Sequence, residues 1–490
     1  MNSKLLMSSF AKERGFVKYQ LESFNSFINF RLQKIITQIG EIKPEVPELN
    51  LKIKLGKIKL GKPSVKEADG AIRTVFPMEA RLRNLTYSAP LYVEMTQVIN
   101  DIEERPVMVH IGDLPVMVKS ELCSTVGLSE QELVEVGEDP QDPGAYFIVN
   151  GTERALVLVE EISPNRIILE KKEGTLTGVA RINSEKDGFV QRHMVEMRQD
   201  GIITASFANV HKIPVIILLK ALGLETDKDI IASVSNDAQI SEEFYPNIYE
   251  SEVKKVEDAL DGIGKHLKVA PEYRKSRAEQ VIDRYLLPHI GQKPENRLEK
   301  AKYLSKVAKK LIDLKMGSVI EDDLDHYANK RLRMSGDLLE LLFRSILLGR
   351  WGLITRICYN YQKLAKRGKV PSVQSVVESN VLTNQLASSL ATGAWVGGRT
   401  GVSQRLERGN FIRTLSHIRN VLSPLTTTQE HFEARELHLT HWGRLCPSET
   451  PEGPSIGLRK YLSIMAEATS GMNEKENKEL LDSLNIENPV

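Results

Sequence analysis

A short stretch without helix or strand character carries two carboxylates beside cationic and aromatic residues. The stretch is CPSETPEGP, residues 446–454, and its three prolines and one glycine exclude a regular helix or a central strand. Glu449 and Glu452 lie inside it, and the preceding LHLTHWGRL adds two histidines, a tryptophan and Arg444. Bare carboxylates would repel phosphates, so we expect the glutamates to orient neighbouring cations such as Arg444 or Arg419.

An arginine-rich segment, residues 394–420, lies upstream of this stretch. Its five cations are all arginine and are accompanied by one acid, Glu407, in a chain that elsewhere uses lysine freely. The planar guanidinium suits phosphate and base contacts, and nearby glycines allow close backbone approach to a ligand. The cations are Arg399, Arg405, Arg408, Arg413 and Arg419. The segment therefore favours phosphate or nucleic-acid binding, with a solvated surface as the alternative.

Residues 411–422 are predicted to form one amphipathic helix. Helical spacing gives a core face of Phe411, Leu415, Ile418 and Leu422. The opposite face then carries Arg413, Ser416, His417 and Asn420. Arg413 and Arg419 fall off the apolar stripe, so replacing either with alanine is expected to change stability by little, within roughly 1 kcal/mol.

A pair of aspartates could hold a divalent cation. Asp323 and Asp325, in EDDLDHY, have a spacing that can hold Mg²⁺ through oxygen ligands. Acidic residues that open a helical segment also cap its amides and suit its dipole. Helical periodicity continues after them, so we expect capping and local pairing with Lys330 and Arg331.

Two further patterns are weak signs of a ligand. His438, His441 and Cys446 match no common zinc spacing. GAWVGGRT, residues 393–400, nearly fits a phosphate-binding loop, but Arg399 replaces its lysine. The preceding NVLTNQLASSLA reads as a helix rather than the required buried strand, so we expect neither a metal nor an ATP site here.

Composition is that of an ordinary globular protein. The chain has 490 residues, 27% charged and 41% hydrophobic, with a net charge of +1. This length predicts two to four domains. The cysteines form no CxxC pair, and no apolar run has membrane-spanning length, so we expect a cytoplasmic protein without membrane contact. They are Cys123, Cys358 and Cys446.

The elements that must position these residues form a mixed α/β (α+β), multi-domain pattern. An amphipathic helix is predicted from residue 16, and lysine alternates with Leu or Ile in a strand from 51 that is bent at Gly56. Asn150-Gly151 predicts a hairpin. Residues 296–392 are predicted to be almost wholly helical, with breaks near 315–325 and around Gly368 and Pro371. The polar tail is predicted to be a short exposed helix or a frayed end.

Several long motifs, in order along the chain, resemble one family. HLTHWGRLCPSETPEGPSIGL is similar to the signature of the second-largest subunit of multisubunit DNA-directed RNA polymerases, the counterpart of bacterial beta. TGAWVGGRTGVSQRLER, TLSHIRN, EARLRNLTYSAPLYVEM, DPGAYFIVNGTERALV, DDLDHYANKRLRMSGDLL and QLESFNSFI resemble the same family. The family's subunit is usually longer, and in some archaea it is split into two chains. This chain resembles the N-terminal piece, called B double-prime.

The resemblance implies an architecture of protrusion, inserted lobe, fork and the start of an external domain. The implied spans are 1–155 for the first part of the protrusion, 156–327 for the lobe, 328–392 for the second part of the protrusion, 393–465 for the fork, and 466–490 for the start of the external domain and the tail.

The resemblance also implies roles for individual residues. The loop matching SETPEGP would lie beside the active centre, where Glu449, Thr450, Glu452 and Gly453 shape the site. Fork loop two corresponds to SPLTTTQEHFEAR, residues 423–435. Nucleic-acid contacts would come from Arg399, Gln404, Arg405, Arg413, His417, Arg419 and Arg444.

By the same resemblance, the chain works only within an assembly. Its partners would be the other polymerase subunits, especially the C-terminal half (B prime) and the largest subunit, together with the DNA template and the RNA–DNA hybrid. No metal ligand is expected in this chain, because the largest subunit holds the catalytic Mg²⁺ and the zinc site lies in the other half. The alternatives are a stand-alone nucleic-acid-binding protein and a metal-dependent enzyme that uses Asp323 and Asp325.

Overall fold

The chain divides into two compact units, one of which is inserted in the sequence of the other. A computed structural model describes residues 3–46, 49–67, 69–172, 174–250, 253, 255–365, 371–469 and 474–484. Unit 1 comprises residues 1–161 and 332–490, and unit 2 comprises residues 162–331. In the described residues, no helix is long and apolar enough to cross a membrane.

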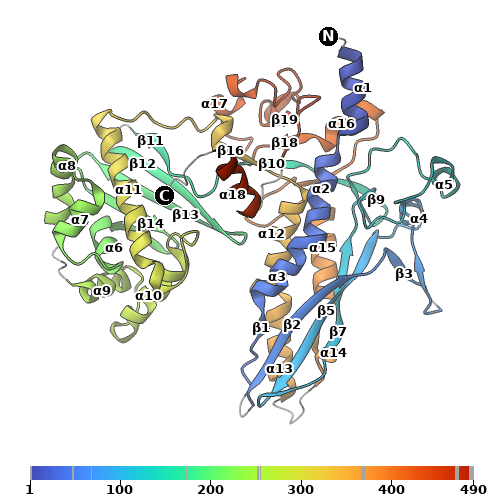
Figure 1. Ribbon diagram of the computed structural model, residues 1–490, viewed down its shortest axis with the longest axis horizontal. Helices are drawn as coiled ribbons and strands as arrows, with labels where there is room; N and C mark the ends of the chain where they lie inside the picture. Colours follow the sequence, from blue (N-terminus) through green and yellow to red (C-terminus); the bar gives the residue numbers. More distant parts are fainter. Residues whose placement is uncertain are drawn as a thin grey trace. The chain divides into compact units, whose positions relative to one another are not determined.

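Unit 1 packs helices against a five-stranded antiparallel sheet (Figure 1). The sheet has the order β1-β2-β5-β6, with β7 also paired to β5. Its strands are β1 Glu41–Ile42, β2 Leu51–Leu60, β5 Ser88–Ile99, β6 Ile102–Glu103 and β7 Val107–Pro115. Its N-terminal and central helices are α1 Ser3–Glu13, α2 Lys18–Ser26, a π-helical turn Phe27–Arg31, α3 Leu32–Ile39, α12 Ser335–Leu348, α13 Leu353–Ala365, α14 Val373–Val376 and α15 Asn380–Thr392.

Smaller elements complete unit 1. Two smaller sheets are present, a three-stranded sheet of order β17-β9-β8 and a four-stranded sheet of order β16-β10-β18-β19. The strands are β3 Ser64–Lys66, β4 Ile72–Thr74, β8 Phe147–Val149, β9 Thr152–Leu156, β10 Leu158–Ile162, β16 Lys330–Arg333, β17 Ser403–Arg405, β18 Asn420–Leu422 and β19 Arg459–Tyr461. The helices are α4 Pro77–Leu82, α5 Glu130–Glu135, α16 Phe411–Ile418, α17 Phe432–Arg435 and α18 Glu474–Ser483.

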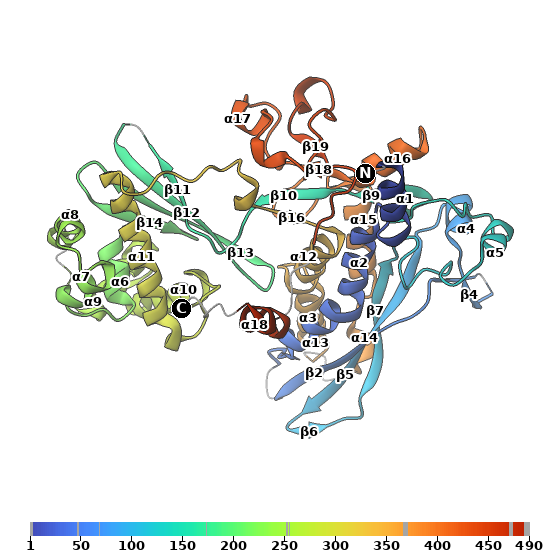
Figure 2. The same ribbon diagram turned by 45° about the horizontal axis from the view of Figure 1, so that its top comes forward.

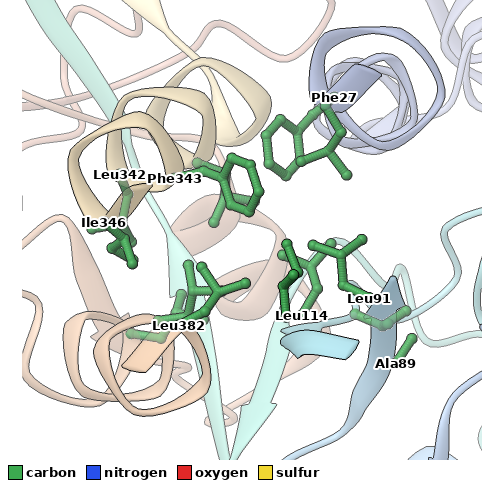
Figure 3. Packing of buried hydrophobic residues seen from close by; sticks show 14 of the residues in the cluster. Phe27, Ala89, Leu91, Leu114, Leu342, Phe343, Ile346 and Leu382 are labelled. Carbon is green, nitrogen blue, oxygen red and sulfur yellow. The ribbon is translucent and has the colours of Figure 1, made fainter. Parts of the chain in front are cut away.

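The core of unit 1 joins segments that are distant in sequence. Phe27 meets Phe343 edge-on, with ring centroids 6.3 Å apart, beside the sheet residues Leu91 and Leu114 (Figure 3). Helices α2 and α12 approach so closely that a Cβ on Gly336 would lie 2.1 Å from the Ser23 carbonyl oxygen. Only glycine fits at this crossing, which fixes the start of α12 against α2.

Unit 2 is a five-stranded antiparallel sheet covered by helices. The order β11-β12-β13-β14-β15 follows the sequence, as in a meander. The strands are β11 Ile168–Lys171, β12 Leu176–Lys186, β13 Phe189–Arg198, β14 Ile203–Phe207 and β15 Val210–Pro214. The helices are α6 Val215–Ala221, α7 Asp227–Val234, α8 Ala238–Tyr249, α9 Val256–His266, α10 Arg274–Tyr285 and α11 Arg297–Met316.

Several predicted elements are confirmed. The Asn150-Gly151 turn joins β8 to β9, and both residues have positive φ, at 48° and 71°. The strand β2 changes register between Leu55 and Ile58, where Gly56 was predicted to bend it. The break near 315–325 follows α11, whose C-cap Gly317 is left-handed. Gly368 lies outside the described residues, and the tail helix α18 is described only for 474–483.

Two predicted helices are wrong in extent. Helical periodicity was expected to run on after EDDLDHY, but residues 330–333 form β16 and the helix begins at Ser335. The predicted helix 411–422 ends at Ile418, and 420–422 form β18. Strand pairing with β10 and β19 overrides the helical spacing in this segment, because a ladder of backbone hydrogen bonds and a buried Val421 reward the extended form.

Candidate nucleic-acid interface

The sheet β10-β18-β19 supports the CPSETPEGP stretch. Residues 423–458 join β18 to β19, and Figure 2 shows them gathered with α17 beyond these strands. Backbone hydrogen bonds tie this connecting segment to itself and to β19. Cys446 N–H donates to the Tyr461 carbonyl at 2.8 Å, and Ser423 N–H donates to the Leu458 carbonyl at 2.9 Å. The loop is therefore held at both ends by ordered strands.

Thr450 braces the loop from inside. Its hydroxyl accepts the Gly457 N–H at 2.9 Å and donates to the Arg459 carbonyl at 2.9 Å. Glu449 accepts a hydrogen bond from the Ser416 hydroxyl of α16. These contacts add to the stiffness that the prolines give. The loop is thus held by these hydrogen bonds as well as by its prolines.

The predicted orienting role of the glutamates takes a different form in the structure. Glu449 was expected to orient a neighbouring cation. It accepts its hydrogen bond from Ser416 and acts on Arg419 only through charge, since burial lowers the pKa of that guanidinium and Glu449 acts to raise it. Arg444 is exposed and donates to the Thr440 carbonyl at 3.0 Å. Glu452 is exposed, and within the described residues it forms no ion pair. Gly453, with φ of 78°, follows it and begins a short turn.

The arginines of the 394–420 segment differ widely in their surroundings. Arg405, in β17, is exposed, and no acidic side chain of the described residues forms an ion pair with it. Arg413 is 44% exposed and pairs with Glu407. Arg399 pairs with Glu161 and donates to the Val396 carbonyl at 2.7 Å. Arg405 and Arg413 therefore present the most accessible guanidinium groups of this segment.

Arg419 was expected on an open face, and that expectation is wrong. The residue is 5% exposed, and its guanidinium donates to four backbone carbonyls. Three of them follow β19, at distances of 2.6, 3.1 and 3.0 Å, and the fourth is from the N-terminal region. The acceptors are Ser463, Ile464, Ala466 and Phe16. Burial lowers the pKa of Arg419, while nearby Tyr19, Glu467 and Glu449 act to raise it.

The buried His417 is hydrogen-bonded to the half-buried Gln404. His417 Nδ1 accepts the Glu407 N–H at 3.1 Å, which leaves Nε2 as the donor to Gln404 Oε1, also at 3.1 Å. The Gln404 amide in turn donates to the Gly401 carbonyl at 2.9 Å. Burial lowers the pKa of His417, and an Nδ1 that accepts a hydrogen bond belongs to a neutral ring. His417 was placed on the polar face of a helix, but it is buried and positions Gln404 from below.

Arg408 belongs to a network of acidic and aromatic side chains, and its own side chain is 38% exposed. It bonds both Glu153 oxygens at 2.7 and 2.9 Å and Asp142 at 2.8 Å, and it lies 4.9 Å from the Tyr146 ring centroid. A second arginine, Arg81, shares Glu153 at 2.8 Å. This pairing anchors the strand β17 region to β8 and β9.

The acidic and histidine patterns form no metal centre in the described residues. No group of three or more His, Cys, Asp or Glu side chains there could hold an ion. Asp323 Oδ1 accepts the Asp325 and His326 amides at 2.8 and 3.2 Å, and Asp325 pairs with Lys330 at 2.9 Å. The predicted pairing with Lys330 is confirmed, whereas no ion pair of Arg331 is found among the described residues. The predicted helix capping is wrong, because these hydrogen bonds close a turn and the helix begins only at Ser335. The residues before GAWVGGRT form the helix α15, as expected.

One residue of this region was missed at the sequence level. Arg435, at the end of α17, donates to five backbone carbonyls of two separate segments. The only sequence signal was a lone cation in the acidic run EHFEARE. Its partners are main-chain atoms, which leave no trace in the side-chain pattern.

Comparison with known proteins defines the class of this chain. Residues 15–384 match the family model described as RNA polymerase beta subunit, and residues 404–468 match the model described as RNA polymerase Rpb2, domain 3. The chain belongs to the RNA polymerase beta subunit family.

The relatives divide into chains of similar length and longer chains. The chain is 47% identical to the DNA-directed RNA polymerase subunit Rpo2N of Methanocaldococcus jannaschii, over 98% of each chain. It is 42% identical to Rpo2N of Methanococcus vannielii over the whole of both. It is also 46% identical to subunit Rpo2 of Sulfolobus acidocaldarius, where the match covers 96% of this chain but 42% of the relative.

Proposed function

We propose that the chain is the N-terminal part of a split archaeal second-largest RNA polymerase subunit, the part called B double-prime. It forms one wall of the nucleic-acid cleft and supports templated RNA synthesis from ribonucleoside triphosphates. The observation that carries the proposal is the match to Rpo2N of Methanocaldococcus jannaschii over 98% of each chain, beside a match that covers only 42% of the longer Rpo2 of Sulfolobus acidocaldarius. The remaining part would come from a separate chain, B prime.

The site geometry supports contact with nucleic acid on the side that carries CPSETPEGP. Arg405, Arg413 and Arg444 have accessible guanidinium groups, which suit phosphate contacts. Gln404 and Arg399 belong to the same arginine-rich segment. Gln404 is hydrogen-bonded to His417, and Arg399 is paired with Glu161. Arg419 and His417 act from beneath this surface, since both are buried.

The active-centre role belongs to the rigid loop. Glu449, Thr450, Glu452 and Gly453 shape the site beside the RNA–DNA hybrid. The part of the chain that the structure describes has no cluster of His, Cys, Asp or Glu side chains that could hold a metal ion. Mg²⁺ is held by the largest subunit in the assembled enzyme, where it supports phosphoryl transfer. In this proposal unit 2 is the lobe, residues 1–155 and 328–392 form the protrusion, residues 393–465 form the fork, and residues 466–490 begin the external domain.

Exposed apolar residues near the loop support assembly with other subunits. Leu439 is 92% exposed and Trp442 is 91% exposed, within four residues of each other. Large apolar side chains at such exposure are typical of surfaces that another chain covers. B prime and the largest subunit are the proposed partners, together with template DNA and the hybrid.

Affinity purification from native cells tests the proposal. A tagged copy of this chain should bring down the largest polymerase subunit and B prime in equal amounts, in a fraction that makes RNA on a DNA template. Recovery of the tagged chain as a monomer that binds nucleic acid by itself would instead support the stand-alone binding protein.

A further inference from the structure

Arg435 links two loop segments that no regular element joins. Its five donors all point at main-chain oxygens, at distances between 2.7 and 3.4 Å. Three acceptors precede α17, one is the last residue of the CPSETPEGP stretch, and one follows that stretch. They are Thr427, Gln429 and Glu430 on one side and Pro454 and Ile456 on the other. No carboxylate takes part in these five contacts. The guanidinium therefore holds the two segments by directed hydrogen bonds and not by ion pairs.

The backbone of Arg435 also packs closely against the loop, at Gly457. A Cβ on Gly457 would lie 2.4 Å from the Arg435 carbonyl oxygen and 2.5 Å from its Cα, and Gly457 has φ of 71°. The Gly457 N–H is the group that Thr450 accepts. Arg435 and Thr450 therefore both contact the turn at residues 454–457. Glu452 lies in sequence between Thr450 and this turn.

We propose that Arg435 is a positioning residue for the active-centre loop. It fixes residues 427–430 to residues 454–456, so that the two segments move as one body and Glu452 keeps its place. The inference rests on the proposed function and adds to it a residue that touches neither substrate nor nucleic acid. Lysine can replace it only in part, because an ammonium has three donors on a flexible stem and cannot span both segments.

The test compares Arg435→Ala and Arg435→Lys in the reconstituted polymerase. Arg356→Lys is the matched control, because Arg356 lies on α13, away from the loop, and forms an ion pair with Glu378. We measure the maximal rate of nucleotide addition, the KM for nucleotides, the lifetime of the elongation complex and the melting temperature of the assembly. Loss of alignment at a reacting centre lowers the rate by about tenfold to a hundredfold.

We expect the maximal rate to fall while the other three measured quantities stay close to those of the control. Arg435→Ala should lower the maximal rate by about tenfold, and Arg435→Lys should recover only part of that loss. KM and complex lifetime should stay as in the Arg356→Lys enzyme. The melting temperature should change little, because the five carbonyls belong to exposed residues and water can replace the guanidinium there. A Thr450→Val change should lower the rate as well. Combining it with Arg435→Ala should add little, because both changes release the same turn.

Three outcomes would overturn the inference. The first is an Arg435→Ala enzyme with an unchanged rate. The second is a rate loss that follows a lowered melting temperature and is equal for Arg435→Lys. The third is failure of both variants to assemble, which would assign Arg435 to folding alone. Failure of the proposed function looks different, because then the wild-type chain would not assemble with polymerase subunits or restore RNA synthesis.

Discussion

Replacing Arg419 with alanine should destabilise unit 1 strongly, whereas replacing Arg413 should not. The Arg419 guanidinium satisfies four carbonyls at a site where 95% of the residue is shielded from water, as its 5% exposure indicates. A buried acceptor without a partner costs about 1–3 kcal/mol. Ser463 and Ala466 are only half-buried, so water can replace part of the loss. We expect a net decrease of about 2–4 kcal/mol in the free energy of unfolding.

Arg413 provides the internal control for this prediction. It lies six residues earlier and is 44% exposed, and its pairing with Glu407 is of the surface kind, worth about 1 kcal/mol or less. Thermal unfolding of the purified variants, followed by circular dichroism, measures both. Arg419→Ala should melt roughly 5 °C or more below wild type, and Arg413→Ala within about 2 °C of it. Equal melting temperatures for the two variants would refute the reasoning, because the four carbonyl contacts would then carry no stability.

Four further predictions follow from the described contacts. Burial lowers the pKa of His193 and of His289 to about 4, against 6.5 in an unfolded chain. Unit 2 should therefore lose stability as pH falls from 6.5 to 4, by on the order of 3 kcal/mol for the buried His193, and His193→Gln should flatten this pH dependence in acid denaturation. Arg405→Ala and Arg413→Ala should shorten elongation-complex lifetime more at high salt, and lifetimes equal to wild type across a salt series would contradict phosphate contact. Gly457→Ala should impair nucleotide addition, because its Cβ cannot fit against Arg435, and a wild-type rate would contradict the packing. The purified chain alone should make no RNA with Mg²⁺ and all four nucleotides, and template-dependent product would contradict its subunit role.

Local signals predicted the elements that are decided locally. Asn150-Gly151 specifies a hairpin because both positions need positive φ, and the structure has 48° and 71° there. Lysine alternation with a slip at Gly56 predicted β2 and its change of register. These features depend on backbone sterics and side-chain period within a few residues, so no knowledge of distant partners is required.

Features decided by distant backbone partners could not be predicted in this way. The helical spacing of residues 411–422 was genuine, but pairing of β18 with two other strands ended the helix at Ile418. Arg419 and Arg435 were not assigned their roles, because their acceptors are main-chain carbonyls that any residue type could supply. An arginine held by carbonyls therefore looks the same in sequence as one held ready for phosphate.

The most direct test of the central claim is omission and add-back of this chain in a polymerase assembled from purified subunits. The measured quantity is template-dependent RNA synthesis on a preformed RNA–DNA scaffold. We predict no synthesis by the assembly that lacks the chain and full recovery when the chain is added in equal amount. Full activity without the chain, or no recovery on adding a folded chain, would contradict its assignment as part of the second-largest subunit.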